Sequence, residues 1–297
     1  MDLSHMTVGE KLFQVFAVLF IFLMSAAMLY PFIHLLSVSF STPTEAIRPG
    51  FHLFPLEFST EAYSKTFSSG QIWIGFGNTV FRTVAGTFLS LIFMAMTAYA
   101  LSKKYLPHRT FWTMFIVFTM FFQGGLIPTY LLIKGLGLLD SRWVYVLAAP
   151  YLISTFSMLI MRNFFMSIPS ELEDSAKIDG ASDIKILYTI IIPLSKPILA
   201  TVGLWSAVNH WNAWFDGLLY IQDTSKMLLQ TYLRRLIVEN RSEEVQILMD
   251  QAVGAMDVIP ETVKASTLMV ATLPIIILYP FLQKYFVKGI LVGSLKG

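Results

Sequence analysis

Residues 170–197 read SELEDSAKIDGASDIKILYTIIIPLSKP, a polar stretch that lies between two long apolar blocks of the sequence. Its first half is acidic and suited to a helix. Ser170 and Glu173 have the spacing of a capping box, in which each side chain satisfies a free amide at the helix start. Gly180 is predicted to end the helix, because glycine accepts the left-handed conformation that a helix end often needs. From Ile184 the chain becomes apolar again.

One face of this predicted helix is small and shallow. Leu172, Ser175, Ala176 and Asp179 share that face, since residues three and four apart are neighbours on a helix surface. Another molecule could therefore approach this face closely. The residues alone leave two interpretations open: a solvated helix between two membrane spans, or a docking element for a partner.

The rest of the chain is dominated by apolar blocks. Of 297 residues, 55% are hydrophobic and 13% are charged, whereas soluble domains carry about 25% charged residues. A run of about 20 apolar residues can cross a bilayer as a helix, and lipid leaves no partner for the amides of an open strand. The sequence therefore predicts an all-α membrane protein. Its six transmembrane helices are predicted at residues 12–37, 74–101, 111–133, 144–161, 192–218 and 265–286.

The distribution of Lys and Arg predicts the orientation. Their density beside the spans is higher on the side that holds both chain ends, and this favours a cytoplasmic location. Residues 1–11 are then a cytoplasmic N-terminal segment and residues 12–297 a transmembrane domain. A cytoplasmic loop covers about 163–191, and an external loop about 222–264. The first apolar run is too long for a signal peptide and is predicted to be the first span.

Several kinds of chemistry are not supported by the sequence. It contains no cysteine, and no glycine is followed directly by lysine, as a phosphate-binding loop of an ATPase requires. The five histidines form no H-x-x-x-H pair for a metal. A net charge of +2 does not suggest a nucleic-acid partner. We expect no catalytic residue and no metal ligand, and Arg82 is expected to be a structural residue between helices or one that snorkels.

The stretch from residue 169 resembles the cytoplasmic E-A-A-x-x-x-G loop of binding-protein-dependent ABC importer permeases. In sugar permeases this loop is similar to P-x-E-L-x-E-A-A-x-I-D-G-A followed by I-x-L-P. The positions that match are Pro169, Glu171, Leu172, Ala176, Ile178, Asp179, Gly180, Ala181, Ile190 and Pro193. Asp174-Ser175-Ala176 stands at the E-A-A positions, with Asp in place of Glu and Ser in place of the first Ala.

Further motifs resemble the MalG-like carbohydrate permeases of the inner membrane. They are IPTYL at 127–131, GLGLLD at 135–140, WNAW at 211–214, QKYFVKG at 283–289 and GSLKG at 293–297. The resemblance implies the MetI-like fold of type I ABC importers, with a cytoplasmic coupling helix. It also implies half of the transmembrane path of an ATP-driven oligosaccharide importer in a bacterial cytoplasmic membrane. The C-terminal motifs are similar to the branch of the family associated with complex or uronic-acid oligosaccharides.

The same resemblance implies the partners. These are a second homologous permease forming a heterodimer, two cytoplasmic ATPase subunits that bind ATP and Mg²⁺, an extracytoplasmic solute-binding protein, the oligosaccharide and membrane lipid. No cofactor is expected on this chain. The residues implied to contact the ATPase are Glu171, Glu173, Asp174, Ser175, Ala176, Asp179 and Gly180.

A second candidate site lies on the predicted fifth span. Trp205, Asn209, Asn212 and Asp216 follow one another at spacings of four, three and four, which places them on one helix face. Amides suit sugar hydroxyls and an indole suits a sugar ring, so this stripe is a candidate substrate path. The alternative is that the two Asn side chains bond to neighbouring helices.

Two broader questions stay open from the sequence. The loop 222–264 contains an amphipathic helical pattern, which suits a helix at the outer membrane surface or a contact with the solute-binding protein. Two other functions compete with the importer permease. They are a self-contained secondary carrier or channel for a small solute, and a membrane anchor that only assembles other proteins.

Overall fold

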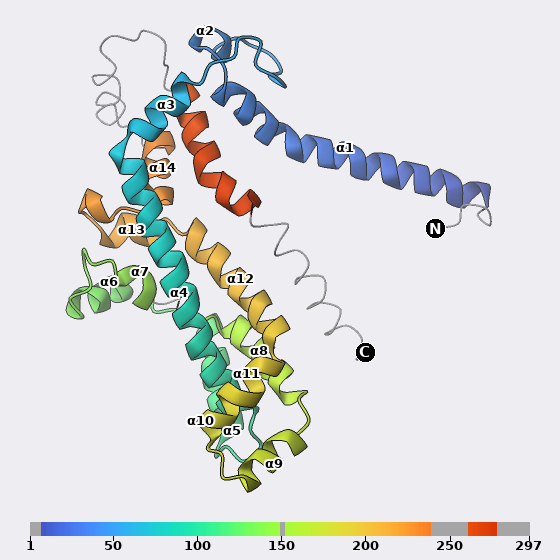
Figure 1. The fold of residues 1–297 in the computed structure, drawn as a ribbon, viewed down its shortest axis with the longest axis vertical. Helices are drawn as coiled ribbons and strands as arrows, with labels where there is room; N and C mark the ends of the chain where they lie inside the picture. The colour runs from blue at the N-terminus through green and yellow to red at the C-terminus, as the bar shows by residue number, and fades with distance from the viewer. Residues whose placement is uncertain (1–6, 149–151, 239–260, 278–297) are drawn as a thin grey trace. The chain divides into compact units, whose positions relative to one another are not determined.

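The computed structural model describes residues 7–148, 152–238 and 261–277, and these residues form helices and no β-strand (Figure 1). The helices are α1 Val8–Ser39, α2 Pro43–Ala46, α3 Glu61–Ser68, α4 Gly70–Ser102, α5 Arg109–Phe121, α6 Leu126–Gly135, α7 Val144–Leu147, α8 Thr155–Met166, α9 Glu171–Ile178, α10 Asp183–Ile186, α11 Ile192–Leu194, α12 Lys196–Asn212, α13 Phe215–Tyr220 and α14 Leu229–Val238. A π-helical turn Leu187–Ile191 and a 3₁₀ turn Thr224–Lys226 complete the set, and residues 261–277 are also helical. The all-α prediction is confirmed for the described residues.

The chain divides into two units. One contains residues 1–69 and 235–272, and the other contains 70–234 and 273–297. In the first unit, the Thr66 hydroxyl lies 2.6 Å from the Ser266 hydroxyl, which joins α3 to the helix at 261–277. The buried Glu45 carboxylate accepts the backbone N–H of Glu57 at 2.9 Å, which fixes the turn before α3. Both candidate sites lie in the second unit.

Two of the predicted spans are continuous helices. Within the described residues, α1 and α4 are each long and apolar enough to cross a membrane, and two bent helix pairs raise the number to four if each pair is one span. Helix α1 continues past Pro31 without a break. The prediction of six spans goes beyond these four and stays a prediction.

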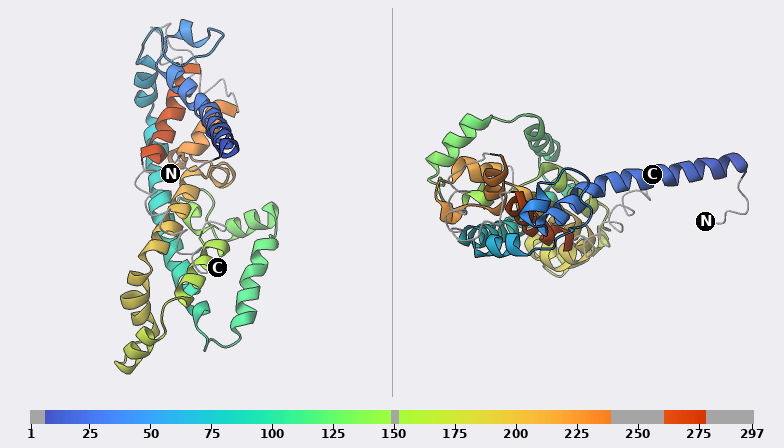
Figure 2. Two further views of the ribbon diagram at one scale, coloured as in Figure 1. Left: turned by 90° about the vertical axis from the view of Figure 1, so that its right-hand side faces the viewer. Right: turned by 90° about the horizontal axis from the view of Figure 1, so that it is seen from above.

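The third and fourth spans are not the single helices that we expected. Helices α5 and α6 meet at an angle of 112°, and the bend between them can be followed in the green segment of Figure 2. The chain turns at Gly125, whose φ of +90° is strained for any other residue. Helix α7 ends at Leu147 and α8 begins at Thr155, so residues 144–161 contain two helices. The sequence carries a turn signal at each break, Gly124-Gly125 at the first and Pro150 at the second, and the prediction of continuous spans passed over both.

The fifth span is also interrupted. Residues 183–194 meet α12 at an angle of 86°. Helix α12 ends at Asn212 because Ala213 adopts an extended conformation, and α13 follows. Of the predicted sixth span, the described part up to residue 277 is helical. The C-terminal motifs at 283–289 and 293–297 lie outside the described residues.

Helix α4 is the centre of the second unit, where it packs against α8 and α12. One core cluster joins the C-terminal half of α4 to α8, the π-helical turn and α12; its buried residues include Met94, Tyr99, Met158, Met161, Phe165, Ile186, Ile191 and Val202. A second cluster surrounds α7 and includes Ile133, Val144, Tyr145, Tyr220 and Leu228. Gly86 allows a close crossing of α4 and α12, since a Cβ there would lie 2.4 Å from the His210 ring.

Candidate functional site

Helix α9 ends as predicted but begins differently. Gly180 has a φ of +75°, its N–H donates to the Lys177 carbonyl at 3.0 Å, and the Ala181 N–H donates to the Ala176 carbonyl at 2.9 Å. This is the Schellman arrangement that closes a helix on a glycine. The capping box was wrong, because the Ser170 side chain makes no capping hydrogen bond. Its expected partner, Glu173, is bound to another residue.

The residues expected to contact the ATPase are not all at the surface. Glu171, Asp174, Ser175, Asp179 and Gly180 are exposed. Two apolar neighbours share this surface: Leu172 is 44% exposed and Ile178 is 87% exposed.

Ala176 and Glu173 differ from the other expected contacts. Ala176 is half-buried and packs against the first core cluster, so the shallow face predicted for α9 is partly covered. Glu173 is only 8% exposed, and an intramolecular ion pair occupies its carboxylate. The expectation that Glu173 faces basic groups of a partner is therefore replaced by a contact within the chain.

The partner of Glu173 is Lys103, which directly follows the last residue of α4. The two side chains are 10% and 11% exposed and form an ion pair. The Lys103 amine also lies 4.0 Å from the centre of the Tyr99 ring. This pair was not predicted from the sequence, although the basic residues at 103–109 follow a predicted span directly and were a signal for an acidic partner.

A second contact holds the same loop to the chain after α9. The Tyr105 hydroxyl donates a hydrogen bond of 2.9 Å to the Asp183 carboxylate. The Lys177 amine lies 4.3 Å from the centre of the Tyr105 ring and 3.6 Å from the Asp183 carboxylate. Helices α9 and α10 are thus fastened to the loop between α4 and α5.

A cavity of about 1060 Å³ lies in the second unit where its helices are interrupted. Residues at the α5–α6 break, residues before α8 and residues at the α12–α13 break all line it. Non-helical backbone is tolerated at membrane depth where it lines a cavity, which explains why the breaks meet here. Aliphatic side chains such as Met94, Met120 and Ile153 form part of the lining. Its polar and aromatic members include Thr119, Phe122, Gln123, Thr129, Phe156, Ser206, Asn209, Asn212, Trp214 and Tyr220.

The predicted substrate path coincides with this cavity in part. Asn209 and Asn212 are exposed and line it. Trp205 is not among the lining residues, and its ring stacks on Phe156 at 6.3 Å between ring centres. Asp216 lines the cavity but belongs to α13, so the prediction of one continuous stripe was wrong.

The carboxylate of Asp216 is neutralised by Arg82 of α4. One guanidinium nitrogen donates to the carboxylate at 2.8 Å, and a second lies 2.6 Å from its other oxygen. The Arg82 side chain is fully buried, and its guanidinium carbon lies 5.3 Å from the centre of the Tyr145 ring. The expected structural role of Arg82 between helices is confirmed, since it joins α4 to α13.

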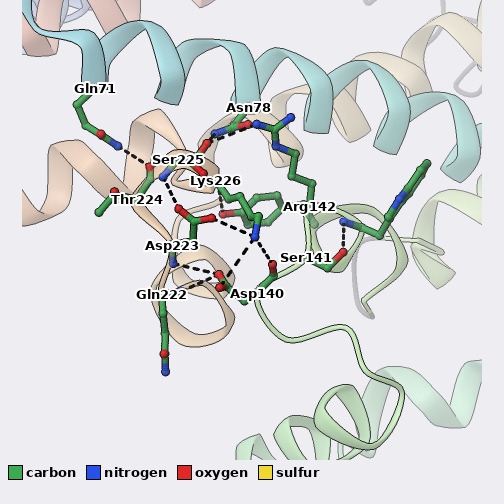
Figure 3. A network of polar contacts seen from close by, with 12 residues as sticks. Gln71, Asn78, Asp140, Ser141, Arg142, Gln222, Asp223, Thr224, Ser225 and Lys226 are labelled. Atoms are coloured by element: carbon green, nitrogen blue, oxygen red, sulfur yellow. Dashed lines mark hydrogen bonds and ion pairs between the residues drawn. The ribbon is translucent and has the colours of Figure 1, made fainter.

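A polar network fixes the segment that follows α13 (Figure 3). The Asp140 carboxylate accepts the N–H groups of Gln222 at 3.2 Å and Asp223 at 3.0 Å. The Lys226 amine donates to the Asp140 carbonyl at 2.8 Å and lies 3.1 Å from the Asp223 carboxylate. The Ser225 hydroxyl and N–H, with Lys226, lower the pKa of Asp223 to about 2. This segment is therefore held to the turn before α7.

Helix α14 packs its apolar face on protein. Leu229 is fully buried and Leu233 is 5% exposed, and the Leu229 N–H donates to the Thr79 hydroxyl of α4 at 3.0 Å. The guanidinium of Arg234 lies 3.7 Å from the centre of the Trp214 ring. Leu229 and Leu233 thus face protein and not a membrane surface, whereas Ile237, further along α14, is 39% exposed. Residues 239–260 lie outside the described part of the chain.

Comparison with known proteins gives the family. The chain is 40% identical over 97% of its length to a polygalacturonan/rhamnogalacturonan transport system permease protein of Bacillus subtilis, and covers 99% of that protein. It is 41% identical over 99% of its length to Protein LplC of the same organism, of which it covers 98%. No family model matches the chain.

Solved structures agree with these relatives. A chain of a bacterial ABC transporter involved in the import of the acidic polysaccharide alginate matches with a TM-score of 0.88 and 33% identity, covering 95% of this chain and 99% of that one. A chain of a bacterial alginate ABC transporter in complex with its pentasaccharide-bound periplasmic protein matches in fold, with a TM-score of 0.59 at 15% identity. From these likenesses we conclude that the chain belongs to the membrane permeases of carbohydrate ABC importers.

Proposed function

We propose that this permease forms half of the transmembrane path of an ATP-driven oligosaccharide importer. A second homologous permease completes the path, two cytoplasmic ATPase subunits bind ATP and Mg²⁺ and hydrolyse the ATP, and an extracytoplasmic binding protein delivers the sugar. The chain itself is non-catalytic. The observation that carries the proposal is the surface of α9, where acidic and apolar side chains stand exposed on a helix fastened to the core through Lys103 and Ala176.

The exposed surface of α9 is the proposed contact with the ATPase. Glu171, Asp174 and Asp179 offer carboxylates for charge-assisted hydrogen bonds to basic groups of the partner. Leu172 and Ile178 supply apolar area that is lost from water on docking. Both chain ends and α9 then lie on the cytoplasmic side, as the distribution of Lys and Arg favours.

The cavity at the helix breaks is the proposed wall of the sugar path. Asn209, Asn212 and Gln123 offer amides for sugar hydroxyls, and Trp214 and Tyr220 offer aromatic faces. Relatives are named for polygalacturonan/rhamnogalacturonan transport and for alginate import. These names support an oligosaccharide of an acidic polysaccharide as the substrate class.

A charge reversal at Asp174 tests the proposed docking. Asp174 is exposed in the first turn of α9, so Asp174→Arg leaves the packing of the chain intact while placing a cation against the basic partner surface. We expect the ATPase to co-purify at least about fivefold less, and sugar uptake in proteoliposomes to fall with it. Glu61→Arg, at an exposed position of α3, is the matched control. Wild-type assembly and uptake in Asp174→Arg would refute the docking surface.

A further inference from the structure

We infer that Lys103 is a positioning residue that ties α9 to α4, so that movement of α9 passes directly into α4. The inference rests on the proposed role of α9 as the contact with the ATPase. Movement of α9 can also pass to α12 through the chain that connects them. The contact of Lys103 with Glu173 adds a second route, through α4.

The contact between Lys103 and Glu173 involves groups that the surrounding structure holds in place. Lys103 follows α4 directly, and its N–H still donates to the Ala100 carbonyl at 3.3 Å, so its backbone continues the end of that helix. Its amine lies between the Tyr99 ring of α4 and the Glu173 carboxylate of α9. A buried ion pair of this kind holds its partners in one geometry, because separating them leaves two desolvated charges.

The same end of α4 is fixed to other elements. The Arg162 side chain of α8 donates to the Leu101 carbonyl at 3.0 Å. Tyr105 adds its hydrogen bond to Asp183 of α10. The end of α4 is therefore the point where α8, α9 and α10 are joined.

From this point α4 leads to the cavity without a break. It is a single helix of 33 residues, about 50 Å long at 1.5 Å per residue. Arg82, further along α4, binds Asp216, which lines the cavity on α13. The alternative route through the sequence contains a π-helical turn and a bend of 86° before α12. The straighter and better packed route to the cavity wall is α4.

The test measures a movement at the cavity driven by ATP in the assembled complex with its partner subunits. Because the chain contains no cysteine, spin labels can be placed at Phe122→Cys and Phe215→Cys, which are exposed lining positions at two helix breaks. ATP is the only probe, so the sugar need not be known. We expect ATP to change the distance between the labels in the otherwise wild-type chain.

Lys103→Met should assemble with the ATPase but reduce the ATP-driven distance change at least about fivefold. Lys103→Arg should keep it, since arginine can still bind Glu173. Lys104→Met is the matched control, because Lys104 is the exposed neighbour and should show the full change.

The double variant Lys103→Met with Glu173→Gln separates transmission from stability. It removes both charges, so no desolvated charge is left without its partner and the stability lost in Lys103→Met is regained, but the tie stays broken. We expect the distance change to remain lost. A full change in Lys103→Met, or its return in the double variant, would overturn the inference. The proposed function fails separately: if Asp174→Arg still assembled with the ATPase, the docking surface would be refuted. That variant leaves Lys103 and Glu173 unchanged, so the two failures can be told apart.

Discussion

At the scale of single residues, two buried ion pairs join distant elements of the second unit. Arg82–Asp216 joins α4 to α13 and Lys103–Glu173 joins α4 to α9. Each brings together residues that are far apart in the sequence. The cation of the first pair lies on α4 and that of the second directly follows its last residue, so α4 organises the cavity wall at one position and the α9 surface at its end.

Asp216→Asn should destabilise the fold by about 3–5 kcal/mol, because it leaves the fully buried Arg82 charge without its carboxylate. Thermal unfolding of the detergent-solubilised protein measures the loss. Asp183→Asn is the control, since the Lys177–Asp183 pair is 38% and 52% exposed and such pairs contribute about 0–1 kcal/mol. Equal melting temperatures for Asp216→Asn and the unchanged protein would contradict the structural role of the pair.

Residue-scale prediction from the sequence succeeded where the cause is local. Gly180 ends α9 because the left-handed conformation is required at that position, and the sequence shows this directly. The capping box failed because the Glu173 carboxylate is bound by Lys103, a residue 70 positions away. Pattern matching within one helix cannot show a competitor of that kind.

At the scale of elements, the crossing of α4 and α12 depends on one glycine. Gly86→Ala would place a Cβ 2.4–2.7 Å from atoms of the His210 ring, and such overpacking costs about 1–3 kcal/mol. Gly77→Ala lies on the same helix with nothing within 4 Å of its new Cβ, and should be neutral or slightly stabilising. Unfolding temperatures of the two variants can be compared directly. If Gly86→Ala had the same unfolding temperature as Gly77→Ala, the close crossing would be refuted.

The helix interruptions show where element prediction ends. Long apolar runs predict α1 and α4 well, because a continuous run and a continuous helix coincide there. The break at 122–125 falls on Phe-Gln-Gly-Gly, a local turn signal that the span prediction passed over, whereas at 213–214 the apolar run continues but the helix does not. The cause is tertiary, since the freed backbone lines a cavity that only the folded chain forms. Asn209 and Asn212 were found from their spacing, whereas Gln123 on a neighbouring break was not.

At the scale of the whole molecule, the exposed α9 surface and the cavity belong to one unit and are connected by α4. This arrangement suits a subunit in which a partner moves α9 and the movement changes the conformation of the cavity. The family could be inferred from the sequence because the loop motif depends on local turns and small residues. The route between the two sites could not, because it depends on contacts between distant residues.

The most direct test of the account is a cross-link between α9 and the ATPase. Ile178 is 87% exposed on α9, and Ile178→Cys places a single thiol in a chain that otherwise has none. Labelled with a short photoreactive group in the assembled complex, it should cross-link to the ATPase subunit. Phe51→Cys should not, because Phe51 is 86% exposed and lies between the first two predicted spans, which the predicted orientation places outside the cell. Equal cross-linking from both positions, or none from residue 178 in a complex that hydrolyses ATP, would contradict the account.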